Sequence, residues 1–284
     1  YGDHRDLHRL IRRQRQMCIR DRYYMKPPLI LLINPWIYDF AAYDLWAKPL
    51  GFLVIASLLI KNGYIIKYID CLDSFHPLMA NDVNSSYFSP KKGGQGRFFK
   101  EIIEKPALLK DIKRPYYRYG IKEQIFNSEI ENTPMPDAIL VTSGMTYWYP
   151  GVFAVISKVK RTFPKVPVIL GGIYSTICYN HAKKFSGADY IIKGKGEISL
   201  LNLLFRLTGK KIEYLPNPEN LDSYPKPAFY LQNKINYICL KTSNGCPYRC
   251  SYCSSSILNP TFKQKNPIKV VEEIKFWVKE YGVN

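Results

Sequence analysis

From Pro28 onward, the chain alternates between short apolar runs of strand length and longer segments of helix length. An unbroken apolar run from residue 29 to Asn34 is typical of a strand that is buried on both faces of a sheet. Strands are predicted at residues 29–34, 64–70, 138–142, 166–170 and 190–192, and helices at 50–62, 152–162, 176–185 and 197–208. This alternation predicts an α/β fold, a doubly wound domain around a parallel five-stranded sheet.

Composition places the chain among soluble globular proteins. It has 284 residues, of which 46% are hydrophobic and 23% are charged, so a sizeable core can form. The longest apolar run, residues 50–60, falls well short of the ~20 residues that a membrane-spanning helix needs. Seven cysteines and no evident secretory signal argue against a disulfide framework. We therefore predict a cytoplasmic protein with no membrane partner.

The net charge of +18 raises nucleic acid as a partner. Residues 1–24 hold seven Arg against three Asp, and the run 15–22 resembles translated sequencing-adapter sequence. We interpret residues 1–24 as a non-native leader, with Met25 as the start; the alternative is a basic arm for nucleic acid. The remaining positive charge is dispersed, which favours a solvated surface over a nucleic-acid site.

The loops that follow the predicted strands contain small and polar residues. In doubly wound sheets, ligands bind beyond the carboxyl ends of the strands, and glycine allows a backbone to approach a flat ligand closely. Tight turns are the alternative explanation for paired glycines. The candidate residues are Asn34, Ser143, Gly144, Gly171, Gly172, Gly194, Gly196 and Glu197.

Three cysteines, Cys246, Cys250 and Cys253, lie on one predicted loop and are separated by three and then two residues. Thiolates hold iron–sulfur clusters, normally one per iron, so a set of three leaves one iron of a cubane open. A zinc ribbon is the alternative, but it requires two Cys-x2-Cys pairs. Cys239 could supply a fourth ligand, although its apolar surroundings in the sequence favour a buried small residue.

This spacing, with the aromatic Tyr252 before the last cysteine, resembles the signature of the radical S-adenosylmethionine (SAM) enzymes. The resemblance implies a 4Fe-4S cluster on the three cysteines and SAM on its open iron. It further implies reductive cleavage of SAM to a 5′-deoxyadenosyl radical, with electrons from a reductant such as flavodoxin or ferredoxin. Tyr252 would shield the cluster or contact the adenine of SAM.

Residues 25–208 resemble the cobalamin-binding-like, flavodoxin-like domain that precedes the radical SAM domain in many such enzymes. The similarity rests on residues 31–35, 49–52, 62–64 and 169–174 and on the turn from Gly194 to Glu197. It implies a cobalamin site at the candidate residues of the strand ends, and methyl transfer to an unactivated carbon. The loop from Asp39 to Asp44 has no His for cobalt. Cobalamin is therefore expected to bind without this ligand, or the domain is a scaffold without cobalamin.

The resemblance also suggests a division of the chain. Residues 71–136 form an insertion, interpreted as a lid or packing arm, and residues 209–236 form a Pro-rich linker. A strand at 237–241 and a helix at 270–281 are predicted to be the first βα unit of a radical SAM (partial TIM) barrel. On this interpretation the chain is an N-terminal fragment that is inactive alone.

Two functions from other classes remain open. One is a non-catalytic corrinoid- or nucleotide-binding module, and the other is a zinc-containing nucleic-acid-binding protein. The residues that would select a substrate are not identified by the sequence.

Overall fold

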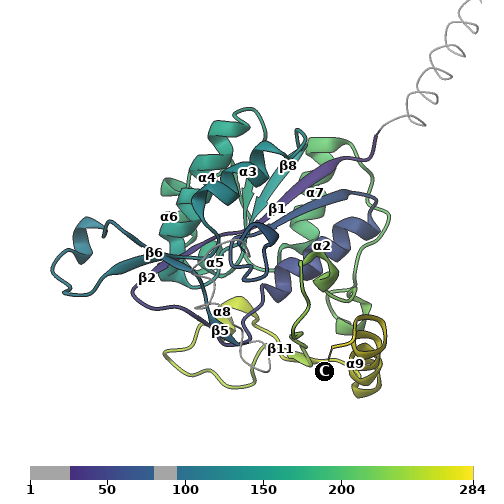
Figure 1. The fold of residues 1–284 in the computed structure, drawn as a ribbon. Helices are drawn as coiled ribbons and strands as arrows, with labels where there is room; N and C mark the ends of the chain where they lie inside the picture. Colours follow the sequence, from purple (N-terminus) through teal and green to yellow (C-terminus); the bar gives the residue numbers. More distant parts are fainter. Residues whose placement is uncertain (1–25, 80–94, 284) are drawn as a thin grey trace, which may run out of the picture.

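A parallel five-stranded sheet forms the centre of the computed structural model, which describes residues 26–79 and 95–283 (Figure 1). The predicted leader therefore lies outside the described residues. The strands are β1 (Leu29–Asn34), β4 (Ile65–Asp70), β8 (Ala138–Val141), β9 (Val168–Leu170) and β10 (Tyr190–Ile191). Their order is β10-β9-β8-β1-β4, and each neighbouring pair is parallel. The predicted sheet is confirmed.

Helices cover both faces of this sheet, as a doubly wound fold requires. Helices α2 (Leu50–Lys61) and α7 (Gly196–Thr208) share one apolar core. The opposite core includes side chains of α3 (Glu123–Glu131), α4 (Tyr149–Thr162), α5 (Ile173–Ile177) and α6 (Tyr179–Phe185). The helix predicted at 176–185 thus occurs as two helices that meet at Cys178.

The unbroken apolar pattern of β1 follows from these two cores. Leu31 and Ile33 point into the core beneath α3 and α4, whereas Ile30 and Leu32 point into the core beneath α2 and α7. All four side chains are fully buried, since a strand with helices on both sides has no solvent-facing row.

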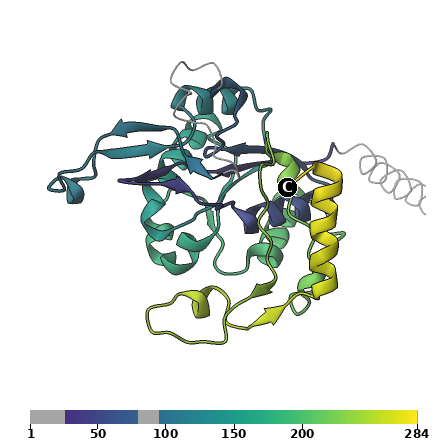
Figure 2. The same ribbon diagram turned by 60° about the horizontal axis from the view of Figure 1, so that its bottom comes forward.

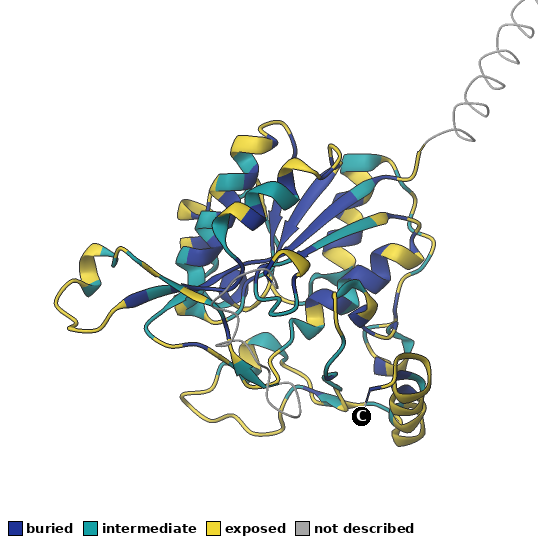
Figure 3. Cartoon of the chain, viewed as in Figure 1, coloured by how far each residue is buried: buried dark blue, intermediate teal, exposed yellow. Residues whose placement is uncertain are grey.

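The insertion at 71–136 contains strands that pair with two short strands from before residue 71. Strands β2 (Ile37–Asp39), β7 (Tyr116–Tyr119) and β6 (Lys100–Ile103) form a three-stranded antiparallel sheet, and β3 (Tyr43–Asp44) pairs with β5 (Gly96–Arg97). Short 3-10 helices occur at Pro77–Met79 and Ala107–Leu109. The β6–β7 hairpin projects from the domain (Figure 1), and Leu108 near its tip is 95% exposed. Figure 3 shows this exposed tip beside the buried central sheet.

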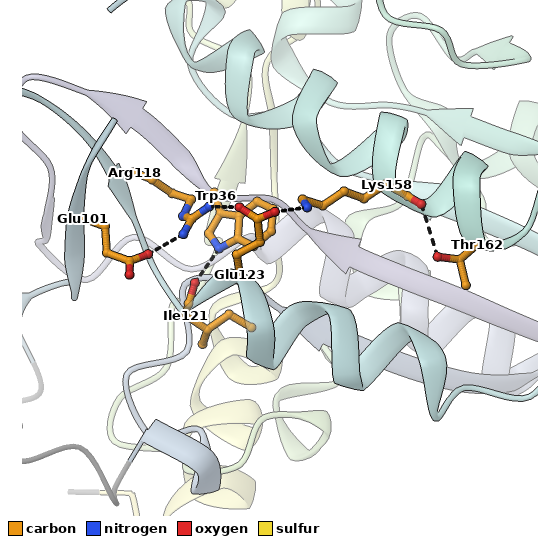
Figure 4. A network of polar contacts seen from close by, with 7 residues as sticks. All are labelled: Trp36, Glu101, Arg118, Ile121, Glu123, Lys158 and Thr162. Atoms are coloured by element: carbon orange, nitrogen blue, oxygen red, sulfur yellow. Dashed lines mark hydrogen bonds and ion pairs between the residues drawn. The ribbon is translucent and has the colours of Figure 1, made fainter. Parts of the chain in front are cut away.

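Arg118 fastens this hairpin to the domain (Figure 4). Its buried guanidinium forms ion pairs with Glu101 on β6 and with Glu123 at the start of α3, and Glu123 also pairs with Lys158 of α4. The guanidinium lies 5.2 Å from the ring centroid of Trp36, whose indole N–H donates to the carbonyl of Ile121 (2.8 Å). Arg118 of β7 therefore links β6, the start of α3 and Trp36.

We expect Arg118→Met to lower the free energy of unfolding by about 2 kcal/mol, because charge-assisted hydrogen bonds are lost inside the fold. The cost stays moderate since the freed carboxylates of Glu101 and Glu123 still reach water (side chains 34% and 40% exposed). Urea denaturation measures the change. Glu272→Gln, which breaks an exposed pair with Lys269, is the control and should leave the free energy of unfolding unchanged, because water screens an exposed ion pair. Equal effects of the two variants would contradict this prediction.

The predicted strand at 237–241 is wrong. Instead, Tyr237 donates a hydrogen bond to Asp44 (2.5 Å), and Ile238 and Cys239 pack in an apolar cluster. Tertiary contacts thus override the strand propensity of this run. The cysteine loop is framed by β11 (Ser243–Asn244) and β12 (Lys263–Gln264), which pair antiparallel, and it contains α8 (Ser255–Leu258). The barrel remains a prediction.

Helix α9 (Pro267–Tyr281) includes the predicted helix at 270–281. It begins earlier because the side chain of Asn266 accepts the N–H of Ile268, which caps the helix. Trp277 is buried against Phe229, with ring centroids 5.3 Å apart, and belongs to the same cluster as Leu53 of α2. Helix α9 consequently lies along the side of the sheet domain (Figure 2).

Residues 209–236 are held to the domain rather than free. The hydroxyl of Ser57 donates to the carbonyl of Lys226 (2.6 Å), and the N–H of Ala228 donates to the carbonyl of Leu53 (3.0 Å). The buried side chain of Asn62 bonds to the backbone of residues 213 and 214. Short 3-10 helices at Leu221–Ser223 and Phe229–Leu231 complete the segment. None of the helices in the described part of the chain has the length and apolar character to cross a membrane.

Candidate functional site

Asn34 and Asp70 end the adjacent strands β1 and β4 and face each other in register. The amide of Asn34 donates to Oδ1 of Asp70 (2.7 Å), and the hydroxyl of Tyr68 donates to Oδ2 (3.1 Å). Burial raises the pKa of Asp70 above its usual value, and the hydrogen bond from Asn34 opposes this. Asn34 therefore lies at the carboxyl edge of the sheet, as predicted, and its side-chain amide is hydrogen bonded to Asp70.

Ser143 and the Gly171-Gly172 pair meet where β8 and β9 end. The Ser143 hydroxyl donates to the carbonyl of Gly171 (2.6 Å). Gly172 has a φ of +106°, and a Cβ there would lie 2.3 Å from the carbonyl oxygen of Ser143. Close packing of the two loops therefore explains why position 172 requires glycine. Gly172 thus has a structural role, as the tight-turn alternative for paired glycines allowed.

Gly171 and Gly194 differ from the other candidate glycines because a Cβ on either would meet no atom within 4 Å. Thr176 connects their loops: its hydroxyl donates to the carbonyl of Gly172 (2.7 Å) and accepts the N–H of Gly194 (3.0 Å). The backbone at the ends of β9 and β10 is thus accessible at Gly171 and Gly194, and the hydrogen bonds of Thr176 fix its position. A flat ligand could approach the chain at these two positions.

The remaining candidates at this edge have packing roles or lie at a helix start. A Cβ on Gly144 would lie 3.2 Å from the Trp148 ring, and one on Gly196 would lie 3.1 Å from Ile192. Glu197 lies in the first turn of α7, where the helix dipole favours a negative charge.

The thiols of Cys246, Cys250 and Cys253 are all exposed. Gly245 precedes them with a φ of +80°, and a Cβ there would lie 2.4 Å from the carbonyl oxygen of Thr261, so the base of the loop requires glycine. Within the described residues, no three His, Cys, Asp or Glu side chains are close enough together to hold a metal ion. The structure therefore places the three thiols on one loop without gathering them at one point.

Cys253 has the environment of a reactive thiol. Its sulfur lies 3.2 Å from the hydroxyl of Ser255 and accepts the N–H of Ser255 (3.5 Å). These hydrogen bonds stabilise the thiolate and lower the pKa of Cys253. The neighbouring Tyr252 is 90% exposed and makes the loop aromatic on its outer side.

The cysteine loop lies beside the carboxyl edge of the sheet. Helix α8 directly follows Cys253 and contacts α5, which directly follows Gly172. The two groups of predicted site residues, far apart in sequence, are thereby brought to the same side of the molecule (Figure 1).

Sequence reasoning did not identify several polar residues of this edge. Ser175 donates to the carbonyls of Gly172 (3.0 Å) and Ile192 (3.1 Å), and Thr176 makes the bonds described above. A Ser-Thr pair closely following a glycine pair was the available signal. Asp70 could have been found because it ends a predicted strand, as Asn34 does.

Cys178 and His181, a Cys-x2-His pair, are not arranged as metal ligands. The Nδ1 atom of His181 is hydrogen bonded to the hydroxyl of Tyr174 (2.6 Å), and its ring packs among aromatic side chains.

No protein-family model matches the chain. It is 24% identical over 175 residues to an uncharacterized methyltransferase of Pyrococcus horikoshii, covering 52% of this chain and 38% of that protein. It is 28% identical over 182 residues to the anaerobic magnesium-protoporphyrin IX monomethyl ester cyclase of Cereibacter sphaeroides, covering 52% and 29%. The cyclase of the same name from Rubrivivax gelatinosus is 26% identical over 227 residues, covering 68% and 38%.

Two solved structures share the fold. The radical S-adenosylmethionine methyltransferase TsrM of Kitasatospora setae superposes with a TM-score of 0.53 at 15% identity, covering 89% of this chain and 46% of that chain. The cobalamin-dependent S-adenosylmethionine radical enzyme OxsB, with aqua-cobalamin bound, gives 0.52 at 14% identity, covering 91% and 33%. The chain thus spans less than half the length of each of these relatives and structures. The relatives and fold neighbours bear out the resemblance noted in the sequence.

Proposed function

We propose that this chain, which is similar in sequence and fold to radical SAM and cobalamin-dependent enzymes, contributes the cluster-binding loop and a corrinoid-binding domain to such an enzyme. The observation that supports the proposal is the contact between α8, which follows the three cysteines, and α5, which follows Gly172 at the end of β9. A cluster cofactor and a flat cofactor could then share one reaction space.

The cysteine loop suits a 4Fe-4S cluster by its donor set. Cys246, Cys250 and Cys253 would hold three irons, and SAM would occupy the fourth. A bound cluster would supply the electron for reductive cleavage of SAM. The exposure of the thiols means that little packing opposes their gathering around the cluster. Tyr252 would then cover the outer side of the site.

The strand ends suit a corrinoid by their shape. Gly171 and Gly194 leave the backbone accessible, and Thr176 fixes the distance between their loops. The loop from Asp39 to Asp44 offers no imidazole, so cobalt would be held without a histidine from it. Methyl transfer to an unactivated carbon is the reaction that we propose for the whole enzyme.

Anaerobic reconstitution with iron and sulfide tests the cluster assignment. We expect the chain to bind about four irons and four sulfides and to show a reduced-state EPR signal that changes when SAM is added. Zinc content, measured in the same purified sample, tests the rival zinc site. Protein that retains zinc and takes up no iron would contradict the proposal.

Gly171→Val tests the corrinoid site. The side chain would occupy the open space at the end of β9, and the φ of Gly171 is not in the left-handed region. We therefore expect hydroxocobalamin to bind at least ~10-fold more weakly, a change of ~1.4 kcal/mol, with no loss of melting temperature. Absorbance retained after desalting measures binding. Unchanged binding would place the ligand elsewhere, and a colourless wild-type protein would favour a scaffold without cobalamin.

A further inference from the structure

Trp46 has an unusual backbone conformation. Its φ is +63°, and within residues 26–79 and 95–283 every other residue with a positive φ is a glycine. A bulky side chain rarely adopts this left-handed region, and such outliers concentrate where a ligand is held. The conformation therefore calls for an explanation at this position.

Neighbouring contacts hold the loop in this shape. The carbonyl of Trp46 accepts the thiol of Cys239 (3.1 Å). Asp44 accepts the hydroxyl of Tyr237 (2.5 Å) and the N–H of Ala47 (3.3 Å). The ammonium of Lys48 lies 4.5 Å from the centre of the Tyr237 ring. The loop is thus fixed from both sides of Trp46.

The side chain held in this way is half exposed. Trp46 is 51% exposed, whereas Trp36 and Trp277 are 1% exposed, and the indole of Trp148 is bonded to Asp39. The adjacent Tyr43 and Leu45 are also exposed, by 55% and 66%. A strained backbone therefore supports an apolar, aromatic surface instead of burying it, which is typical of a binding surface.

The loop lies at the carboxyl edge of the sheet, on the side of β1 and β4. It follows β1 through β2 and β3, and it is tied to residues 237–239, which lead into the cysteine loop. The same segment passes the end of β4, where Gln232 lies 3.5 Å from Oδ2 of Asp70 and Asn233 donates to Asp73 (2.6 Å). A broad, flat ligand that extends across the strand ends from β9 to β1 and β4 would therefore border this loop.

We propose that Trp46 is an aromatic contact for the flat ring of a corrinoid bound at the strand ends. This inference rests on the proposed function. A tryptophan offers the largest rigid apolar face of any side chain at a low cost in conformational entropy. The ring face of a corrinoid is broad and apolar, so the two surfaces are complementary. The ties to Tyr237 and Cys239 fix the direction in which Trp46 is presented.

Titration of the full chain with hydroxocobalamin tests the proposal. Trp46→Gly removes the ring and relieves the backbone, so we expect binding ~10-fold weaker together with a higher midpoint of urea denaturation. Trp46→Phe keeps an aromatic face and should bind within about threefold of the wild type. Corrinoid quenching of the remaining tryptophan fluorescence should be smaller in Trp46→Phe, because the exposed indole is gone.

Phe185→Ala is the matched control, since Phe185 is 53% exposed but ends α6, near the amino end of β10. It should leave binding unchanged. If the wild type binds hydroxocobalamin and Trp46→Gly binds it with equal affinity, Trp46 has no role in binding. The proposed corrinoid site would then still hold. Absence of binding by the wild type would overturn both. A lower denaturation midpoint of Trp46→Gly would overturn the strain on which the inference depends.

Discussion

Cys250→Ala should reduce iron and sulfide uptake on anaerobic reconstitution to the background of unfolded protein. Cys250 is the middle thiol of the loop, and two remaining ligands cannot hold a cubane with one open iron. The substitution should not change stability, since Cys250 is exposed. Iron and sulfide assays with urea denaturation of the same samples measure both effects.

Cys239→Ala is the control for this experiment. Its thiol is partly buried and bonds to the carbonyl of Trp46, so it should be dispensable for the cluster and matter modestly for stability. Loss of iron in Cys239→Ala but not in Cys250→Ala would show that the metal site uses a different thiol set. Equal iron binding by all variants would remove the cluster from the proposal.

Gly172→Ala should lower the free energy of unfolding by about 3 kcal/mol or more. The added Cβ would lie 2.3 Å from the carbonyl oxygen and 2.7 Å from the backbone nitrogen of Ser143, and the φ of +106° is unfavourable for alanine. Both of these atoms are backbone atoms of Ser143, so they cannot move away as the end of a flexible side chain could. Urea denaturation, extrapolated to water, gives the change.

Gly171→Ala provides the comparison one residue away. Its Cβ meets open space, so its effect should stay within about 0.5 kcal/mol of the wild type. Two equal losses would mean that the turn, and not the contact with Ser143, determines stability here. The pair of variants thus separates the packing role of Gly172 from the open edge at Gly171.

The central sheet could be predicted because its strands carry local information. The unbroken apolar run of β1 implies burial on both faces, and the alternation of strands with helices implies parallel pairing. Helix α3 was missed: its sequence, EQIFNSEIE, is polar apart from Ile125, Phe126 and Ile130, which are its buried residues. A short helix of this kind is determined by the core that it covers.

Contacts between residues distant in sequence explain the features that the local sequence pattern could not predict. The run at 237–241 has strand-like composition, yet Tyr237 is drawn to Asp44, almost two hundred residues earlier in the chain. At the site, spacing identified three cysteines on one loop. The contact of the following helix α8 with α5 depends on the path of the whole chain, and no local pattern encodes it.

The hydrogen bonds that hold residues 209–236 to the sheet domain limit how the cysteine loop and the strand ends can move relative to each other. A hinge between two units needs a connection with few crossing contacts, whereas Ser57, Asn62 and Leu53 bond directly to this segment. Rigid-body opening would have to break these bonds together with the burial of Trp277. Rearrangement of the exposed cysteine loop would break none of these bonds, so in the proposed enzyme the segment that moves to admit a substrate would be the one that carries the metal ligands.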